Sequence, residues 1–343
     1  MIKKRLLGIA FIALCICPAG CGKTVEQDKQ YYEEEAESQE QPSLEELFNL
    51  EEIEASGNIL DGAYSYGLRN IDDESMSVSI DEGKLILDIE HDNSGKECEV
   101  GFLMFLDGIP QLNARGESMT KFRTETKSVN HVRVETEPII DVERNTHRLD
   151  CMLIFEPTYT GTREHLEHGN YGSGLPLLPY TVNGIDEKIE TTCVEKVFEM
   201  EPLSNELIER YTREKRDGTK RCQIDEKPLI VELREKESVI TDGIVVDSDM
   251  ELLLAFLGKN SAKYRVSAFL NDEAYPAFDG VPYVDIEVTH DNETILRPIV
   301  NFEDLRIGGN NLFFVYIPVD SDDIYVSENA EKTPTYTILR GEK

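Results

Sequence analysis

The sequence predicts an all-β protein built from two tandem antiparallel β-sandwich domains of immunoglobulin-like architecture, joined by a short helix. From about residue 60, short β-type runs alternate with Gly, Asn and Asp. The middle runs GFLMFL, ELLLAFL and LFFVYI are continuously apolar, as expected for inner strands of a sandwich. A chain of 343 residues with 40% hydrophobic residues can bury two cores. The chain has no Trp, so "immunoglobulin-like" here describes architecture only.

Each predicted domain contains six or seven strands, set by these runs. In the first domain we expect strands near 76–80, 84–91, 98–106, 131–140, 148–156 and 191–199. In the second we expect them near 228–235, 250–257, 263–270, 283–289, 295–302, 312–318 and 334–340.

The two domains share landmarks in the same order, which predicts an internal repeat. The pairs are Asn93-Ser94 with Asn260-Ser261, Phe105-Leu106-Asp107 with Phe269-Leu270-Asn271, Pro110 with Pro276, and Pro138-Ile139-Ile140-Asp141 with Pro298-Ile299-Val300-Asn301. A polar turn and a long apolar strand follow the last pair in both domains.

A helical connector is expected over 201–225, between a first sandwich at 59–200 and a second at 226–343. Ser204 or Asn205 can cap a helix that runs past Tyr211 and ends near Gly218. Arg213, Lys215 and Arg216 would then lie in its last turn, where a helix dipole favours positive charge. We also considered that this basic island attracts the acidic N-terminal segment.

The N-terminus reads MIKKRLLGIAFIALCICPAGCGKT: a positive stretch, an apolar run, and small residues before Cys21. This pattern resembles that of bacterial lipoprotein precursors. The resemblance implies removal of residues 1–20 as a signal peptide and attachment of diacylglycerol to Cys21. It places the protein on the extracytoplasmic face of the cell membrane. The alternatives are an ordinary signal peptide or a membrane helix, although the apolar run is shorter than the roughly 20 residues needed to span a bilayer.

Residues 21–58 form an acidic tether, in which Ser43 and Glu46 make a capping box for one short helix. Loss of the three positive charges in residues 1–20 would take the net charge from −33 to −36. Such a charge excludes nucleic acid as a partner and disfavours direct adsorption to anionic lipid. The expected membrane contact is therefore the lipid anchor.

Four cysteines remain beyond the anchor: Cys98, Cys151, Cys193 and Cys222. Outside the cytoplasm they allow three disulfide pairings. The favoured one is Cys98 with Cys151 and Cys193 with Cys222. The alternative is that they are free thiols buried as small hydrophobic groups.

No motif predicts catalysis, a cofactor or a metal site. His165 and His168 would share a helix face, but the spacing is one residue short of both zinc-protease motifs, and no third ligand is identifiable. The sequence has no G-x-S-x-G elbow and no supported nucleophile–base set. The expectation is a protein that is not an enzyme; a hydrolase with an unrecognised site is the third alternative.

Residues 157–187, which we call the Gly/Tyr-rich segment, are too long for a simple hairpin loop. Tyrosine supplies contact area at low entropic cost in recognition loops. The candidate ligand-binding residues are Tyr159, His165, His168, Tyr171 and Tyr180. The leading hypothesis is that this segment presents a binding surface to a protein, peptide or glycan. A loop packed on its own domain is the structural alternative, and an accessory lipoprotein of a membrane transporter or sensor is the functional one.

Overall fold

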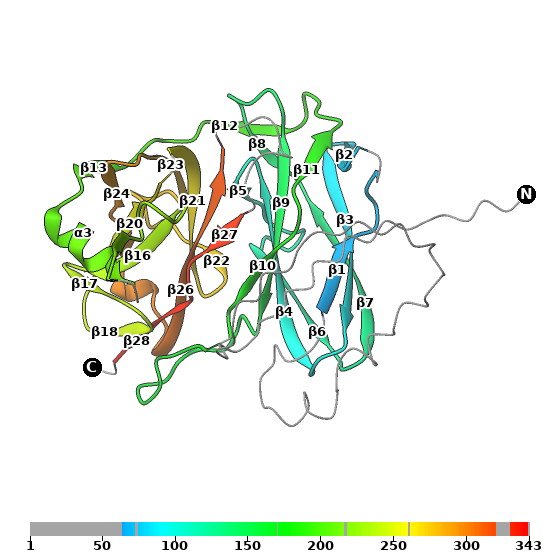
Figure 1. The fold of residues 1–343 in the computed structure, drawn as a ribbon. Helices are drawn as coiled ribbons and strands as arrows, with labels where there is room; N and C mark the ends of the chain where they lie inside the picture. Colours follow the sequence, from blue (N-terminus) through cyan, green and yellow to red (C-terminus); the bar gives the residue numbers. More distant parts are fainter. Residues whose placement is uncertain are drawn as a thin grey trace, which may run out of the picture.

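A computed structural model describes residues 64–72, 75–169, 171–215, 218–259, 261–319 and 330–341. The signal peptide, Cys21 and the acidic tether lie outside the described residues. The described part is almost entirely β, with two sandwich-like halves side by side (Figure 1). None of its helices has the length and apolar character needed to cross a membrane.

The first half contains strands β1 to β12, most of them in one sheet that folds over its own core. The strands are β1 Tyr64–Leu68, β2 Ser77–Asp81, β3 Lys84–Asn93, β4 Cys98–Leu106, β5 Ile109–Pro110, β6 Met119–Thr124, β7 Ser128–Thr136, β8 Ile139–Asp141, β9 Arg148–Phe155, β10 Gly174–Pro176, β11 Tyr180–Asn183 and β12 Glu190–Thr192.

The second half contains two larger facing sheets. Its elements are β13 Glu199–Pro202, α3 Asn205–Tyr211, β14 Thr212–Glu214, β15 Lys220–Cys222, β16 Ile230–Glu235, β17 Ser238–Val239, β18 Gly243–Val246, β19 Met250–Glu251, β20 Leu253–Leu257, β21 Ala262–Leu270, β22 Glu273–Ala274, β23 Tyr283–Val288, β24 Asn292–Leu296, β25 Ile299–Val300, the 3-10 turn η1 Phe302–Asp304, β26 Gly308–Pro318, β27 Glu331–Lys332 and β28 Tyr336–Arg340.

The two halves repeat the same strand pairings, which supports the predicted internal repeat. The pairs β1·β3, β3·β7, β4·β5, β4·β6, β4·β9, β9·β10 and β9·β11 recur as β16·β20, β20·β24, β21·β22, β21·β23, β21·β26, β26·β27 and β26·β28. Even the unusual parallel pair β2·β11 recurs as β18·β28. In one detail the landmark alignment was wrong: the register makes Ala274, not Pro276, the equivalent of Pro110, because both follow a two-residue turn.

The continuous apolar runs are explained by burial of both strand faces. In β4, Val100, Phe102 and Met104 point into the first core, whereas Leu103 and Phe105 point into a cluster shared with the second half. The same alternation in β26 sends Phe314 to its own core and Phe313 to the shared cluster. Because successive strand residues face opposite sides, only a strand covered on both sides can be apolar throughout.

The connector differs from the prediction. Ser204 caps α3 through a bond from Leu207 N to its Oγ (3.1 Å), as expected, but the helix ends at Tyr211. Residues 212–222 instead form the hairpin β14–β15, so Arg213 and Lys215 lie outside the helix, and a helix dipole does not explain the basic island. Leu207 packs against Leu257 of β20, so α3 covers the second half.

The predicted strand at 191–199 is in fact two short strands. Its start, β12, pairs with β8 of the first half, and its end, β13, pairs with β24 of the second. The chain therefore crosses between the halves just before residue 199.

The four cysteines are free thiols in this structure, and the predicted disulfides are absent. Cys151 lies opposite Met104 in β4, six positions along the strand from Cys98. At about 3.4 Å per residue that offset separates the two cysteines by roughly 20 Å, far beyond disulfide reach. Cys98 and Cys151 are buried in the first core, as the alternative interpretation had it, while Cys193 is exposed and Cys222 half-buried.

His91 is a polar residue in the first core. Its side chain is fully buried on β3, and neither ring nitrogen has a hydrogen-bond partner. Its ring lies edge-on to Phe122, with centroids 5.8 Å apart. Burial lowers the pKa of His91 from 6.5 to about 4.

We expect His91 to make the protein acid-sensitive. Between pH 6.5 and 4 the unfolded chain binds a proton at this site and the folded chain does not, so the free energy of unfolding falls as pH falls. The loss reaches about 3 kcal/mol near pH 4. His91→Leu should remove this component, measured as the difference between wild type and variant in urea denaturation at pH 7, 5 and 4. The same acid-induced loss in both proteins would contradict the assignment.

Candidate functional site

The two halves meet face to face through an apolar seam. It contains ten buried side chains from β4, β6 and β9 on one side and from β21, β26 and the start of the 330–341 segment on the other: Leu103, Phe105, Met119, Met152, Ile154, Phe269, Phe313, Val315, Ile317 and Ala330. The ring of Phe269 stacks on that of Phe313 (5.0 Å) and meets that of Phe105 edge to face (5.9 Å). Contacts of this kind fix two sandwiches as one body.

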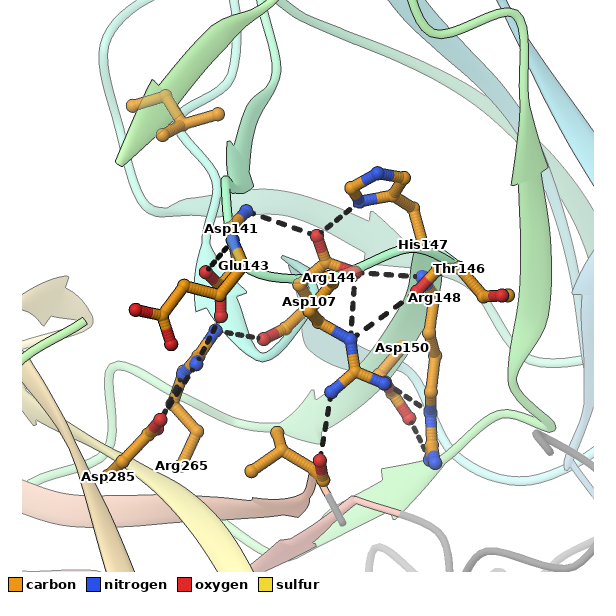
Figure 2. Close-up of polar contacts among 12 residues, drawn as sticks. Asp107, Asp141, Glu143, Arg144, Thr146, His147, Arg148, Asp150, Arg265 and Asp285 are labelled. Atoms are coloured by element: carbon orange, nitrogen blue, oxygen red, sulfur yellow. Dashed lines mark hydrogen bonds and ion pairs between the residues drawn. The ribbon is translucent and has the colours of Figure 1, made fainter. Parts of the chain in front are cut away.

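At one end of the seam a buried arginine ties the halves together. Figure 2 shows Arg265 of β21 reaching across to Asp107 and Asp141. Its Nη1 donates to the Asp107 carbonyl (2.6 Å) and its Nη2 to Asp141 Oδ2 (2.7 Å). Its own half supplies Asp285, which accepts from Nε (2.7 Å) and Nη2 (3.0 Å). All four contacts are charge-assisted or made to a backbone carbonyl, so the buried guanidinium is well satisfied.

Asp107 organises the first-half side of this network (Figure 2). It occupies a two-residue turn with Gly108, and both have positive φ (55° and 78°), as a type I′ hairpin requires. Asp107 Oδ1 accepts from Arg148 N (3.0 Å), and Oδ2 lies 2.7 Å from His147 Nδ1. The turn is thereby locked in the shape that Arg265 contacts.

Beside the network lies a cavity of about 220 Å³, lined mainly by charged residues including Arg144, Lys263 and Glu287. Its deepest groups, Arg265, Asp141 and Asp285, satisfy one another. Their arrangement indicates a structural lock.

At the other end of the seam, residues 157–173 cross from the first half onto the second; we call them the interdomain loop. Asn311 of β26 anchors this loop, since its Nδ2 donates to the carbonyls of Pro157 and Tyr159 (both 2.8 Å). Thr337 of β28 accepts from Gly161 N (3.2 Å) and donates to the Leu166 carbonyl (2.9 Å). The loop is therefore docked on the neighbouring domain, which neither the crest hypothesis nor its alternative foresaw.

The five candidate residues of the Gly/Tyr-rich segment have different fates. Tyr180 is buried in the first core on β11, at the repeat position of Tyr336, so it is a core residue and not a ligand contact. His165 is exposed on a turn closed by bonds to Thr162. The structure does bring together Tyr159, His168 and Tyr171: the two tyrosine rings stack at 4.2 Å, and the His168 ring lies edge-on to Tyr159 at 5.5 Å.

This cluster forms one wall of a cavity of about 360 Å³ between the halves. The interdomain loop contributes His168, Gly169, Tyr171, Gly172, Ser173 and Gly174, and the second half contributes Thr241, Asp242, Lys332, Thr333, Pro334 and Thr335. The lining is thus made of hydroxyls, glycines, two aromatic rings and two charged side chains. A volume of this size is within the range of small-ligand sites.

Lys332 is the residue of this cavity with the most unusual environment. It lies on β27, beside β10 of the first half (Figure 1), and its Nζ is 4.5 Å from the centre of the Phe313 ring. Nζ donates to the Thr333 carbonyl (2.9 Å) and to Thr335 Oγ1 (2.8 Å). Burial lowers the pKa of Lys332 from 10.5 to about 7.

His168 is neutral near pH 7 for a similar reason. Burial lowers its pKa, and the charge of Lys332 adds to this effect, whereas the bond between Nε2 and Asn311 Oδ1 (3.1 Å) opposes it. The described residues contain no group of three or more His, Cys, Asp or Glu side chains that could hold a metal ion.

Sequence reasoning missed Lys332 and Asp242. Neither belongs to a motif, and each enters the cavity only because the chain folds β27 and the start of β18 against the interdomain loop. The one available signal was the Tyr-Thr pair at 180–181, which recurs at 336–337; aligning the repeats on it would have matched Lys332 with Pro176.

Comparison with known proteins adds little. No protein-family model and no curated protein matches the sequence. Among solved structures, a transglutaminase from red sea bream is 9% identical with a TM-score of 0.21, covering 84% of this chain and 33% of that one. The chain thus spans about a third of that enzyme's length. A two-domain protein of unknown function from Bacteroides fragilis is 10% identical with a TM-score of 0.20, covering 73% and 90%. Similarities this low carry no functional argument.

The Arg265 network gives a direct test of the seam. Arg265→Met should leave the carboxylates of Asp141 and Asp285 buried without their partner and lower the free energy of unfolding by about 3–5 kcal/mol. The control is Arg297→Met, which removes the exposed ion pairs to Glu199 and Glu251 and should cost at most about 1 kcal/mol. Urea denaturation followed by tyrosine fluorescence measures both; equal losses would show that Arg265 does not lock the seam.

Proposed function

We propose that this chain is a non-catalytic binding protein, held by lipid at Cys21 on the extracytoplasmic face of the cell membrane. Its ligand enters the 360 Å³ cavity between the two sandwiches. The observation that carries the proposal is this cavity itself, because it contains a lysine and an aspartate that are not paired to each other. Within the described residues, neither Lys332 nor Asp242 forms an ion pair.

The rigidity of the body supports the same role. The seam, the Arg265 network and the docked interdomain loop hold both walls of the cavity in a fixed relation. A preformed site loses less entropy when it binds its ligand. The ligand of such a site is a small compound, or the end of a peptide or glycan, rather than a broad protein surface.

Blocking the cavity should abolish binding. Thr241 is exposed on its rim, so Thr241→Trp fills the entrance without disturbing a core. Purified wild type should retain a compound after equilibration with the low-molecular-weight fraction of a bacterial growth medium, as detected by mass spectrometry. Thr241→Trp should retain at least about tenfold less. The control Ser238→Trp, on exposed β17, should behave as wild type. Equal retention by wild type and Thr241→Trp would refute the cavity as the site.

The anchor is tested separately at Cys21. In wild-type membranes the N-terminal peptide should begin at Cys21 and carry the mass of a diacylglycerol, whereas Cys21→Ala should carry no lipid. Cys193→Ser, at the exposed thiol, should keep the modification and serves as the control. An unmodified Cys21 in the membrane fraction would refute the anchor while leaving the cavity proposal intact.

A further inference from the structure

The charged groups of the cavity define the class of ligand. We infer that the cavity binds a small zwitterionic compound, an amino acid or a short peptide, with its carboxylate on Lys332 and its ammonium group on Asp242. This inference rests on the proposed function and goes further by naming the ligand chemistry.

Lys332 is prepared for a carboxylate. An ammonium group has three donors; the Thr333 carbonyl and Thr335 Oγ1 take two of them, which leaves one for a ligand. No carboxylate of the described residues lies within 4.0 Å of Nζ, since nearby Asp272 pairs with Lys121 at 2.7 Å. The lowered pKa, about 7, reflects a charge that lacks a counter-ion, and a bound carboxylate would supply one.

The lysine is also held in place. Gly174 of β10 lies directly against its aliphatic stem: a Cβ at this glycine would be 3.1 Å from Lys332 Cδ. Any larger residue at 174 would displace the side chain. Lys332 Nζ is therefore fixed between Phe313, two threonine oxygens and the cavity.

Asp242 provides the complementary charge. Its half-buried side chain lines the cavity from the loop before β18, and Oδ2 accepts a bond from Thr241 Oγ1 (2.8 Å). None of the described residues places a basic group within 4.0 Å of this carboxylate. Both Asp242 and Lys332 influence the charge of His168, with opposite signs, so both lie within electrostatic range of the same ring.

The charge of the whole chain favours a zwitterion over an anion. A net charge of −33 repels polyanions from a distance. A ligand with no net charge is not repelled, yet it can satisfy one cation and one anion inside the cavity. The hydroxyls of Ser173 and Thr241 and the exposed backbone at Gly169 suit the amide groups of a short peptide.

The test uses the purified mature chain and calorimetric titration with glycine, diglycine and triglycine. The longest peptide that binds is then compared with its N-acetyl derivative and its C-terminal amide, each lacking one charge. We expect the loss of either charge to weaken binding at least about tenfold, as the loss of a charged hydrogen bond does. Equal affinity for the peptide and both derivatives would overturn the inference.

Two variants assign the ends. Lys332→Met should bind the free peptide and its amide equally while still discriminating against the N-acetyl form. Asp242→Asn should do the reverse. Lys259→Met, at an exposed lysine outside the cavity, should bind as wild type, and circular dichroism checks that all variants are folded. Discrimination that survives in both variants would place the peptide elsewhere.

The outcome separates this inference from the proposed function. If none of the three peptides binds while Thr241→Trp still abolishes retention of another compound, the cavity is the site and the zwitterion assignment is wrong. If Thr241→Trp retains as much as wild type and no peptide binds, both are wrong.

Discussion

The structure depends on four strands that are buried on both faces. In β4, β9, β21 and β26, alternate residues serve a sandwich core and the seam between the sandwiches. This double duty requires the two domains to pack together, because either one alone would expose several large apolar side chains, Phe105 or Phe269 among them, to water. The shared seam also brings the edge strands β10 and β27 side by side, where the cavity forms.

The polar contacts around the seam follow the internal repeat and then depart from it. Asp107 and Asn271 occupy equivalent turns, and each accepts a bond from the backbone of the adjacent strand, Arg148 N at 3.0 Å and Asn311 N at 3.1 Å. Each turn also contacts the opposite domain, the first through Arg265 and the second through the ion pair of Asp272 with Lys121. The two copies thus grip each other by corresponding hairpins, but with different side chains. The repeat explains the geometry, and the divergence sets the charges.

The sequence was informative wherever a local pattern decides the structure. The apolar runs and the Ser204 cap gave the inner strands and the start of α3, because strand burial and capping depend on neighbouring residues. It failed where distant packing decides. The basic residues after Tyr211 suit a helix end, yet they form a hairpin. The Gly/Tyr-rich segment has the composition of a recognition loop, but Asn311 and Thr337, about 150 residues away along the chain, hold it down. Cys98 and Cys151 lie in neighbouring strands, and only the register reveals that they cannot meet.

The cavity arises from the difference between equivalent positions in the two copies. The register matches Lys332 of β27 with Pro176 of β10, since each lies opposite an equivalent residue, Val315 in β26 and Met152 in β9. If both copies carried a lysine here, two ammonium groups would meet at the seam, and their repulsion would oppose docking. A single lysine, facing the small Gly174 of the other copy, can be covered and still reach the cavity. The chemistry of the site therefore belongs to neither domain alone: it exists because one copy lost bulk where the other acquired charge, and it persists only while the seam holds the two edges together.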